Sequence, residues 1–365
     1  MKPTIIIAAI ASRAYAQAAV RAGFEVIAID AFNDVDTQIS CKQVFQIDMQ
    51  NGQFDATQLL AVLDKIELSH GLGLCLGLCF GAGFEAQPAL LTSINQRILL
   101  IGNLAKTVAD CKNQHTFFAF CDAHNMSHPA TQLQRPKHTK NWLEKRIGGS
   151  GGAHIKAVLP LDLPQQLSVY YQQIQAGTPY SCLFLADAKN TQVIGFNQQW
   201  CNSSALLPYR YGGAVSHADL TDAIKNKIEA FVQVASKKFN LRGINSCDFL
   251  LENDAIFMLE INPRLSATLD LYRAAKGDFF SAHITACAGN LKSWPVAEKL
   301  SRAQHIVYAN KLAHVPHSMD WPDWVCDIPQ PNSAIPAGAP LCTVVATART
   351  AKLAKQKVLQ RAACL

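Results

Sequence analysis

The sequence predicts an α/β protein of two or three domains that begins with an open parallel sheet. The first reason is length, because the chain has 365 residues and single hydrophobic cores stop growing at roughly 250–300 residues. The second is the pattern at the N-terminus. A strand-like run at 4–10 precedes a helical stretch at 13–22, which Gly23 stops, and a second run at 24–29 ends at Asp30. This order is typical of a β-α-β unit.

Composition excludes several classes of protein. Hydrophobic residues make up 49% of the chain and the net charge is only +6, which indicates a globular protein rather than a disordered one. No run of 18 apolar residues occurs, so we expect no membrane partner. The basic excess, 33 Lys and Arg against 27 Asp and Glu, suits an anionic small molecule as well as nucleic acid. The twelve cysteines form no C-x-x-C pair, and we expect buried, reduced thiols.

The N-terminus has two alternative interpretations. The apolar stretch 5–11 followed by Ala14-Tyr15-Ala16 imitates a signal peptide. However, Ser12-Arg13 interrupts the stretch and the β-α-β pattern runs through the supposed cleavage site, so we expect a strand and a cytoplasmic protein. A dinucleotide cofactor is not expected, because the turn 8–12 has none of the glycines that a pyrophosphate requires.

The remaining elements divide the chain into three expected domains. These are an N-terminal α/β domain at 1–105, a central domain at 106–300 with a flexible smaller subdomain at about 128–175, and a small β-containing cap at 301–365. The expected helices are 55–67, 112–123, 219–239 with Ser216 as a candidate N-cap, and one at the C-terminus; the expected strands are 73–80, 97–101, 169–174, 180–186 and 341–347.

A predicted β-hairpin carries the chemistry. Its strands are 244–251 and 255–261, with Asp248 on the first, and Glu260 and Asn262 at alternate positions near the end of the second. A three-residue turn at 252–254 would place position 248 opposite 258, with Glu260 as its diagonal neighbour on the same face. A two-residue turn would place the side chain of Asp248 on the opposite face of the hairpin.

These side chains offer only hard oxygen ligands. Two carboxylates and an amide oxygen indicate Mg²⁺, with Mn²⁺ as the alternative ion. Arg264 follows two residues after Asn262 and could stabilise developing negative charge. The alternative is a solvated edge hairpin with ordinary surface acids, which the apolar neighbours Ile256, Met258 and Ile261 disfavour.

A glycine cluster follows Lys145 and a basic stretch at 135–146. Such loops present backbone N–H groups to phosphates, although the P-loop pattern is absent and a flexible surface turn is the alternative. The cluster consists of Gly148, Gly149, Ser150, Gly151 and Gly152.

These motifs, in this order, resemble the ATP-grasp superfamily over roughly residues 1–300. The resemblance rests on a Lys before a glycine-rich loop, a Gln-Gln-Ile-Gln-Ala-Gly hinge, and Asp248 followed by Glu260-Ile-Asn262-Pro-Arg264. The whole chain is most similar to the predicted carboligase branch related to biotin carboxylase, which includes archaeal tyramine–glutamate ligases. The resemblance implies an ATP-grasp fold with a Rossmann-like N-terminal domain, and it implies ATP and Mg²⁺ as cofactors.

The resemblance also implies residue roles. Lys112 and Lys145 would contact ATP phosphates under the glycine loop, Asp248, Glu260 and Asn262 would hold Mg²⁺, and Arg264 would stabilise the transferred group, with Lys145 beside it in catalysis. The hinge beside adenine would consist of Gln172, Gln173, Ile174 and Gln175. The chain departs from the family at Gln172 or Gln173, where members usually have Glu, and at Thr178-Pro179, where they commonly have an acid for ribose. His154 and Ser266 lie next to these motifs as candidate substrate contacts, and a structural role is favoured for His154.

The implied reaction is the ATP-dependent joining of a carboxylate and an amine through an acyl phosphate. The partners are then small-molecule substrates, one of them an amino acid such as glutamate, in the biosynthesis of a one-carbon carrier cofactor; a homodimer is conceivable and nucleic acid is not expected. Two alternatives stay open: a carboxylase-like or other phosphoryl-transferring enzyme, and a non-catalytic protein that binds nucleotides or, through the 135–146 stretch, nucleic acid.

Overall fold

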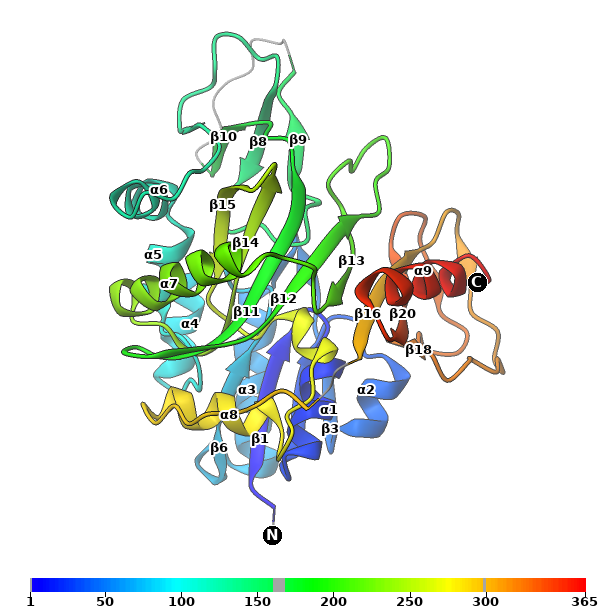
Figure 1. The fold of residues 1–365 in the computed structure, drawn as a ribbon. Coiled ribbons are helices and arrows are strands. Elements are labelled where there is room, and N and C mark those ends of the chain that lie inside the picture. The colour runs from blue at the N-terminus through cyan, green and yellow to red at the C-terminus, as the bar shows by residue number, and fades with distance from the viewer. Residues whose placement is uncertain (1, 160–167, 298–299) are drawn as a thin grey trace.

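The structure is a computed structural model that describes residues 2–159, 168–297 and 300–365. Its N-terminal layer is a four-stranded parallel sheet with the order β3-β2-β1-β6, which confirms the predicted β-α-β beginning (Figure 1). The strands are β1 (Thr4–Ala9), β2 (Glu25–Asp30), β3 (Gln43–Gln46) and β6 (Cys75–Phe80), with a small hairpin of β4 (Met49–Gln50) and β5 (Gln53–Phe54). The helices are α1 (Arg13–Arg21), α2 (Val35–Ser40), α3 (Ala56–His70), the 3-10 turn η1 (Leu72–Leu74) and α4 (Pro88–Asn95).

The alternation of side chains along β1 builds two cores. Ile6 and Ala8 pack with α3 and α4, whereas Ile5, Ile7 and Ala9 pack with α1 and with residues of the following domain. All five side chains are at most 1% exposed. A strand buried on both faces reads as a continuous apolar run, which is the pattern that predicted it.

The predicted strand at 97–101 is wrong. In the described residues, this segment makes only an isolated bridge between Leu78 and Leu100, beside the edge strand β6. Two backbone hydrogen bonds, from Leu78 N to Leu99 O and from Ile101 N to Leu78 O, hold the segment beside β6, and its apolar side chains Ile98, Leu100 and Ile101 pack into the two cores.

A small antiparallel sheet follows two helices. The helices are α5 (Ala105–Lys112) and α6 (Gln114–Ala123), so the helix predicted at 112–123 begins two residues late, where the Asn113 side chain accepts a hydrogen bond from Thr116 N. The sheet has the order β7-β10-β8-β9 and consists of β7 (Thr131–Gln132), β8 (Trp142–Arg146), β9 (Ile155–Ala157) and β10 (Val169–Gln173). Figure 1 shows it at the top of the molecule, away from the parallel sheet.

The largest sheet has eight strands in the order β15-β14-β11-β12-β13-β16-β20-β18. Its first five members are β11 (Thr178–Asp187), β12 (Thr191–Cys201), β13 (Tyr211–Ser216), β14 (Arg242–Glu252) and β15 (Ala255–Asn262), with α7 (Asp222–Phe239), η2 (Ala267–Leu271) and α8 (Phe279–Cys287). Cys182, Phe184 and Ala186 of β11 face α7, whereas Leu183 and Leu185 lie in the core shared with α8 and β1. The sheet thus joins the domains.

The expected N-cap of α7 was Ser216, and this is wrong. Ser216 is the last residue of β13, where its buried hydroxyl accepts a hydrogen bond from Arg302 N. The cap is Thr221, whose side chain accepts from Ile224 N.

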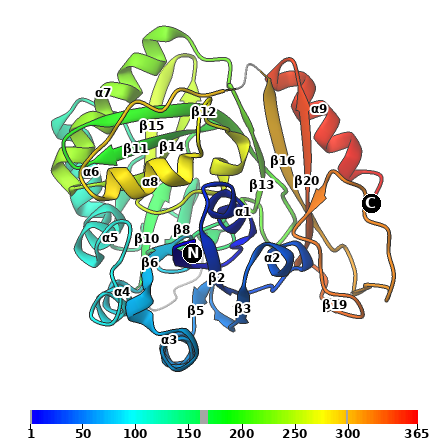
Figure 2. The same ribbon diagram turned by 90° about the horizontal axis from the view of Figure 1, so that it is seen from below.

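The C-terminal strands extend the large sheet and do not form a sheet of their own. They are β16 (Ser301–Tyr308), β18 (Val325–Cys326) and β20 (Pro340–Ala348), accompanied by a two-stranded pair of β17 (Ala313–His314) and β19 (Ala334–Ile335), and by α9 (Ala351–Ala362). The predicted strand at 341–347 and the final helix are confirmed. Both views place α9 beside β16 and β20 at one side of the molecule (Figures 1 and 2).

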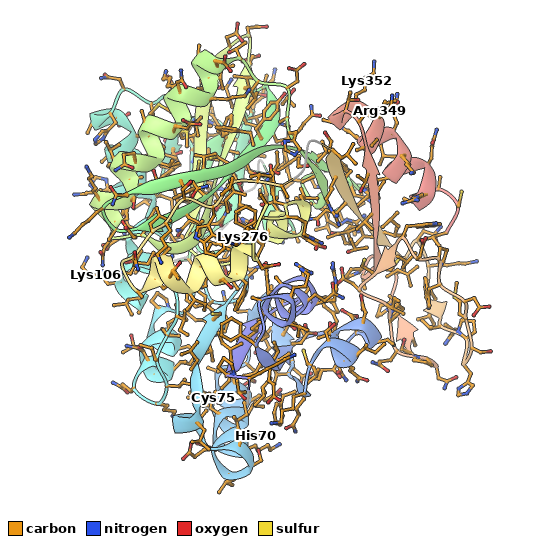
Figure 3. All side chains as sticks on the ribbon, turned by 60° about the horizontal axis from the view of Figure 1, so that its bottom comes forward. His70, Cys75, Lys106, Lys276, Arg349 and Lys352 are labelled. Carbon is orange, nitrogen blue, oxygen red and sulfur yellow. The ribbon has the colours of Figure 1, made fainter. Side chains whose placement is uncertain are left out.

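Three further expectations concern the chain as a whole. All twelve cysteines are free thiols, but only six are buried and Cys201 and Cys364 are exposed, so the expected burial is wrong for half of them. No helix in the described parts of the chain is long and apolar enough to cross a membrane. Exposed basic side chains include Lys106, Lys276 and, close together near the start of α9, Arg349 and Lys352 (Figure 3).

Candidate active site

The hairpin of β14 and β15 has a different turn from the one expected. Glu252 pairs with Ala255, which leaves Asn253 and Asp254 as a two-residue turn with φ of 47° and 66°. Such a turn would reverse Asp248, but a β-bulge intervenes: Phe249 pairs with Met258, whereas Asp248 pairs with Glu260. Asp248 therefore lies directly opposite Glu260, and not on its diagonal.

Asp248, Glu260 and Asn262 form one hydrogen-bonded patch, which we call the acidic patch. The amide Nδ2 of Asn262 donates to Asp248 Oδ2 and to Glu260 Oε1, both at 3.1 Å. Lys112 Nζ donates to Glu260 Oε2 at 2.8 Å and to Asn262 Oδ1 at 2.7 Å. The structure thus brings together four residues that are up to 150 positions apart in the chain.

The electrostatics of the acidic patch suit a cation. Burial and the charge of Glu260 raise the pKa of Asp248 above its usual range. Burial would also raise the pKa of Glu260, but Lys112 and the hydrogen bond from Asn262 lower it. No group of three His, Cys, Asp or Glu side chains suited to a metal occurs in the described residues, so a metal here would take two carboxylates and an amide oxygen. This donor set fits Mg²⁺, completed by water or phosphate oxygens.

Lys145 lies on β8 in a buried polar contact. Its Nζ donates to Gln172 Oε1 at 2.6 Å, and Gln172 Nε2 donates to Thr131 Oγ1 at 3.1 Å. Burial lowers the pKa of Lys145 to about 8, and the negative charge of Glu260 partly opposes this effect. Burial has removed the water that would stabilise the charged ammonium group, and a bound phosphate would stabilise that charge instead.

The glycine loop at 148–152 is pinned between two other segments. Gly148, Gly151 and Gly152 have φ of 68°, 66° and 74°, a region that favours glycine. A side chain at Gly148 would collide with Ala86, and one at Gly152 with the carbonyl of Tyr209. Only glycine therefore lets the loop close against the N-terminal layer and the β12–β13 connection.

The predicted hinge lies where β10 ends. Gln172 and Gln173 are its last residues, and Ile174 N donates to Asn141 O at 2.8 Å. The side chain of Gln175 turns to the hairpin and donates to Glu252 Oε2 at 2.9 Å. The Gln172 amide is engaged by Lys145, so the hinge contributes to the site through that contact.

Arg264 points to the N-terminal layer. Its Nε donates to Glu85 Oε1 at 2.9 Å, and Glu85 Oε2 accepts hydrogen bonds from the backbone N–H groups of Gly83 and Phe84. Arg264 and Glu85 are 11% and 2% exposed. Ser266, two residues further, is buried and its hydroxyl lies 3.0 Å from Thr268 Oγ1.

His154 lies directly under the glycine loop. A Cβ at Gly149 would collide with its ring, and burial lowers its pKa to about 4, so the ring is neutral at physiological pH. Its Nδ1 is buried without a hydrogen-bond partner. These contacts agree with a packing role and leave one polar atom for a ligand.

Three contributors to the site are additional to the expected set. Glu85 holds Arg264, Gln199 Nε2 donates to Asp248 Oδ1 at 3.4 Å, and Thr131 orients Gln172. Glu85 had a detectable signal, because it closes a Gly-x-Gly-x-Glu run directly after a buried strand, where α/β sheets place ligands. Gln199 and Thr131 had none.

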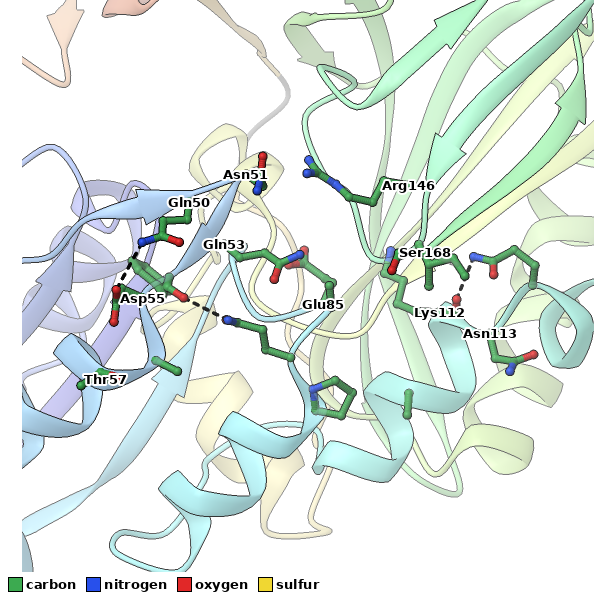
Figure 4. Close-up of a pocket in the computed structure, with 18 residues that line it drawn as sticks. Gln50, Asn51, Gln53, Asp55, Thr57, Glu85, Lys112, Asn113, Arg146 and Ser168 are labelled. Atoms are coloured by element: carbon green, nitrogen blue, oxygen red, sulfur yellow. Dashed lines mark hydrogen bonds between the residues drawn. The ribbon is translucent and has the colours of Figure 1, made fainter. Parts of the chain in front are cut away.

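A cavity of about 750 Å³ opens beside the acidic patch (Figure 4). Lys112 and Glu85 belong both to its wall and to the site described above. The remaining wall comes from the β4–β5 hairpin, the start of α4, the α5–α6 junction and the end of β8.

Comparison with known proteins identifies the central part of the chain. Residues 111–268 match the family described as the ATP-grasp domain. These residues form an ATP-grasp domain. The match runs from the end of α5 to η2 and includes Lys112, Lys145, the glycine loop and the acidic patch.

One curated relative and several solved structures are similar to a larger part of the chain. An uncharacterised protein of Methanocaldococcus jannaschii is 23% identical over 265 residues, which are 68% of this chain and 63% of that protein, so the chain spans less than two thirds of its relative. The biotin carboxylase domain dimer of Hydrogenobacter thermophilus 2-oxoglutarate carboxylase, solved with MgADP and bicarbonate, superposes with a TM-score of 0.74 at 12% identity, over 99% of this chain and 90% of that one. An L-amino acid ligase from Bacillus licheniformis gives a TM-score of 0.68 at 11% identity, over 99% and 97%. The chain therefore has the ATP-grasp fold across its whole length.

Proposed function

We propose that the protein is an ATP-dependent carboxylate–amine ligase that uses Mg²⁺. The acidic patch carries this proposal, because Asp248, Glu260 and Asn262 converge on one point beside two lysines. The ATP-grasp domain supports ATP as the nucleotide, and the amino acid ligase among the structural neighbours supports carbon–nitrogen bond formation.

The chemistry proceeds in two steps. An oxygen of the substrate carboxylate attacks the γ-phosphorus of ATP and the bond to the β-phosphate oxygen breaks, which gives an acyl phosphate and ADP. The amine then attacks the acyl carbon, phosphate leaves, and the nitrogen loses a proton. Magnesium, held by the acidic patch, would supply charge neutralisation at the phosphates.

The residues of the chain supply position and charge. Lys112 contacts Glu260, and Lys145 is close enough for the charge of Glu260 to raise its pKa; both would bind phosphate oxygens. Arg264, fixed by Glu85, would stabilise negative charge on the transferred group. The glycine loop, already in contact with Ala86 and Tyr209, would exclude the water that hydrolyses an acyl phosphate.

Glu260→Ala should abolish turnover. We expect Mg²⁺-dependent ADP release to fall by more than about 100-fold, since loss of outer-shell partners alone costs about 10- to 100-fold in metal affinity or activity. The matched control is Asp254→Asn in the turn of the same hairpin, where φ of 66° suits asparagine. Turnover that survives in Glu260→Ala would contradict the metal assignment.

Because the pKa of Lys145 is lowered in the free protein, we expect the protein to take up a proton when ATP binds. With a pKa of about 8, the side chain is mostly neutral at pH 8.5 in the free protein, and a phosphate raises that pKa again. We expect more than about half a proton to be taken up per ATP at pH 8.5, and uptake from this residue to vanish at pH 6.5. Calorimetry in two buffers of different ionisation enthalpy measures it. Lys145→Arg, which stays charged, should lose the uptake; equal uptake in that variant would assign the proton to another group.

A carboxylase is the second candidate, favoured by the superposition on a biotin carboxylase domain. ADP release that requires bicarbonate and no amine would select it, and strong ATP binding without any turnover would select a non-catalytic nucleotide-binding protein.

The biological setting is also part of the proposal. We expect an amino acid such as glutamate as one substrate, a role in cofactor biosynthesis, a cytoplasmic location and a homodimer. The expected domains remain 1–105, 106–300 with a smaller subdomain at about 128–175, and 301–365; residues 160–167 of that subdomain lie outside the described residues.

A further inference from the structure

The cavity beside the acidic patch has the size of a substrate site. Its volume of about 750 Å³ lies within the roughly 300–1,000 Å³ of typical small-molecule sites, so a small acid leaves room there for a second substrate. It adjoins the reaction centre, because Lys112 contacts Glu260 on one side and lines the cavity on the other. A ligand in this cavity would therefore reach the groups that act on ATP.

The wall of the cavity mixes polar and apolar side chains, and most of its charges are already paired. Glu85 pairs with Arg264, Lys112 pairs with Glu260, and Asp55 caps α3 by accepting a hydrogen bond from Gln58 N. Neutral amide side chains, which bind carboxylates, ammonium groups and hydroxyls, make up much of the wall. They are Gln50, Asn51, Gln53, Gln87, Asn113 and Gln114.

Arg146 is the charge of this wall that stays unpaired. Its Nε is buried and has no hydrogen-bond partner, and across the described ranges no Asp or Glu oxygen lies within 4.0 Å of its guanidinium. Successive side chains of β8 point to opposite faces, and of Lys145 and Arg146 only Arg146 lines the cavity. Arg146 as a whole is half-buried, but a buried Nε without an acceptor is costly, and a carboxylate satisfies a guanidinium with two parallel hydrogen bonds.

The position of Arg146 also defines where its ligand would lie. In Figure 4 the side chain extends from the end of β8 towards Asn51, across the cavity. A Cβ at Gly52 would be 4.0 Å from its Nη2, so the tip of the β4–β5 hairpin faces the guanidinium. Arg146 also borders a small void of about 20 Å³ together with Glu260 and His154. Arg146 thus borders both the cavity and the void beside the acidic patch.

We propose that this cavity binds the acid substrate and that Arg146 holds a second carboxylate of it, distinct from the one that is phosphorylated. The substrate class is then a small polar dicarboxylate. This inference rests on the proposed ligase function. The reacting carboxylate is no longer an anion once it has become part of the acyl phosphate. A fixed cation such as Arg146 therefore suits a second carboxylate, which stays charged throughout the reaction.

The test compares matched acids on the full-length protein. Glutarate and glutamate are set against butyrate and 2-aminobutyrate, with hydroxylamine as the amine, and hydroxamate formation and ADP release are measured. We expect the dicarboxylates to react with at least about tenfold higher kcat/KM, and Arg146→Gln to raise their KM by about 10- to 100-fold while the KM for ATP stays within about twofold. Arg146→Lys should fall in between. Lys156→Gln, on the neighbouring strand β9 and exposed, is the matched control and should change neither constant.

Other outcomes overturn the inference in different ways. A rise in the KM for ATP in Arg146→Gln, with the KM for acid unchanged, would assign Arg146 to the nucleotide. Equal kcat/KM values for monocarboxylates and dicarboxylates would show that the site does not recognise a second carboxylate. If wild-type protein shows no turnover at all, the proposed function fails. Calorimetry then still tests whether the cavity binds a dicarboxylate, with Mg²⁺ and a non-hydrolysable ATP analogue present. Glutarate or glutamate should bind wild-type protein, and should bind Arg146→Gln at least about tenfold more weakly. Absence of dicarboxylate binding to wild-type protein overturns the inference.

Discussion

Arg264→Met should lower the free energy of unfolding by about 3–5 kcal/mol, because it leaves the Glu85 carboxylate buried without its cation. Glu85 is 2% exposed and, among the described residues, keeps only the backbone N–H groups of Gly83 and Phe84 as donors. The burial of Glu85 opposes its charged form, and Arg264 is the main group that holds its pKa below the usual range. Urea denaturation of the variant and the wild-type protein at pH 7 measures the loss.

The double variant Glu85→Gln/Arg264→Met separates stability from catalysis. A neutral amide at position 85 removes the buried charge, so we expect the double variant to recover about 2 kcal/mol relative to Arg264→Met. If Arg264 acts on the transferred group, ADP release should nevertheless remain lost, because no cation has returned. Recovery of both stability and ADP release would show that Arg264 serves only to join the N-terminal layer to the hairpin.

The site was predictable from sequence where its residues follow local rules. The alternation of Glu260 and Asn262 on one strand, and the glycines after Lys145, are local patterns with a direct structural consequence. The β1–α1–β2 unit and α7 follow from hydrophobic periodicity in the same way. The ATP-grasp fold itself came from the order of these motifs, and the family match at 111–268 confirms it.

The features that the sequence did not reveal depend on distant contacts. The bulge that turns Asp248 to Glu260 depends on how two strands register, and a single residue reverses every side chain of a strand. The segment 97–101 is apolar because two cores meet there, which periodicity cannot separate from pairing in a sheet. Gln199 and Thr131 join the site through tertiary contacts, so their neighbours in sequence carry little information about their roles.

Arg13→Met should also cost about 3–5 kcal/mol at pH 7, since Arg13 is a buried cation surrounded by three carboxylates. Arg13 is 4% exposed; its Nη1 lies 2.7 Å from Asp270 Oδ2, and its Nε lies 2.9 Å from Asp327 Oδ1 and 3.8 Å from Asp36 Oδ2. These carboxylates come from η2, from the C-terminal segment and from α2. Removal of the cation leaves Asp270 buried and charged between three parts of the chain.

The pH dependence of this loss follows from Asp270. Burial disfavours its charged form, but Arg13 keeps the pKa of Asp270 well below its usual range, so this ion pair stabilises the wild-type protein above the unfolded pKa of about 3.9 and the stabilisation is lost as the pH falls. In Arg13→Met the carboxylates are protonated more easily on acidification, which relieves their repulsion. We therefore expect the difference in unfolding free energy between the two proteins to narrow from pH 7 to pH 4.5.

Arg21→Met on the same helix is the matched control for Arg13→Met. Arg21 pairs with Asp278 at 2.9 Å but is 39% exposed, and an exposed pair contributes at most about 1 kcal/mol. Because Asp36 also accepts hydrogen bonds from the backbone N–H groups of Asp327 and Ile328, loss of Arg13 should increase amide hydrogen exchange at 325–328 before the remainder of the large sheet. Equal losses in the two variants, or unchanged exchange at 325–328, would mean that the C-terminal segment is held by its strands β16 and β20 and not by Arg13.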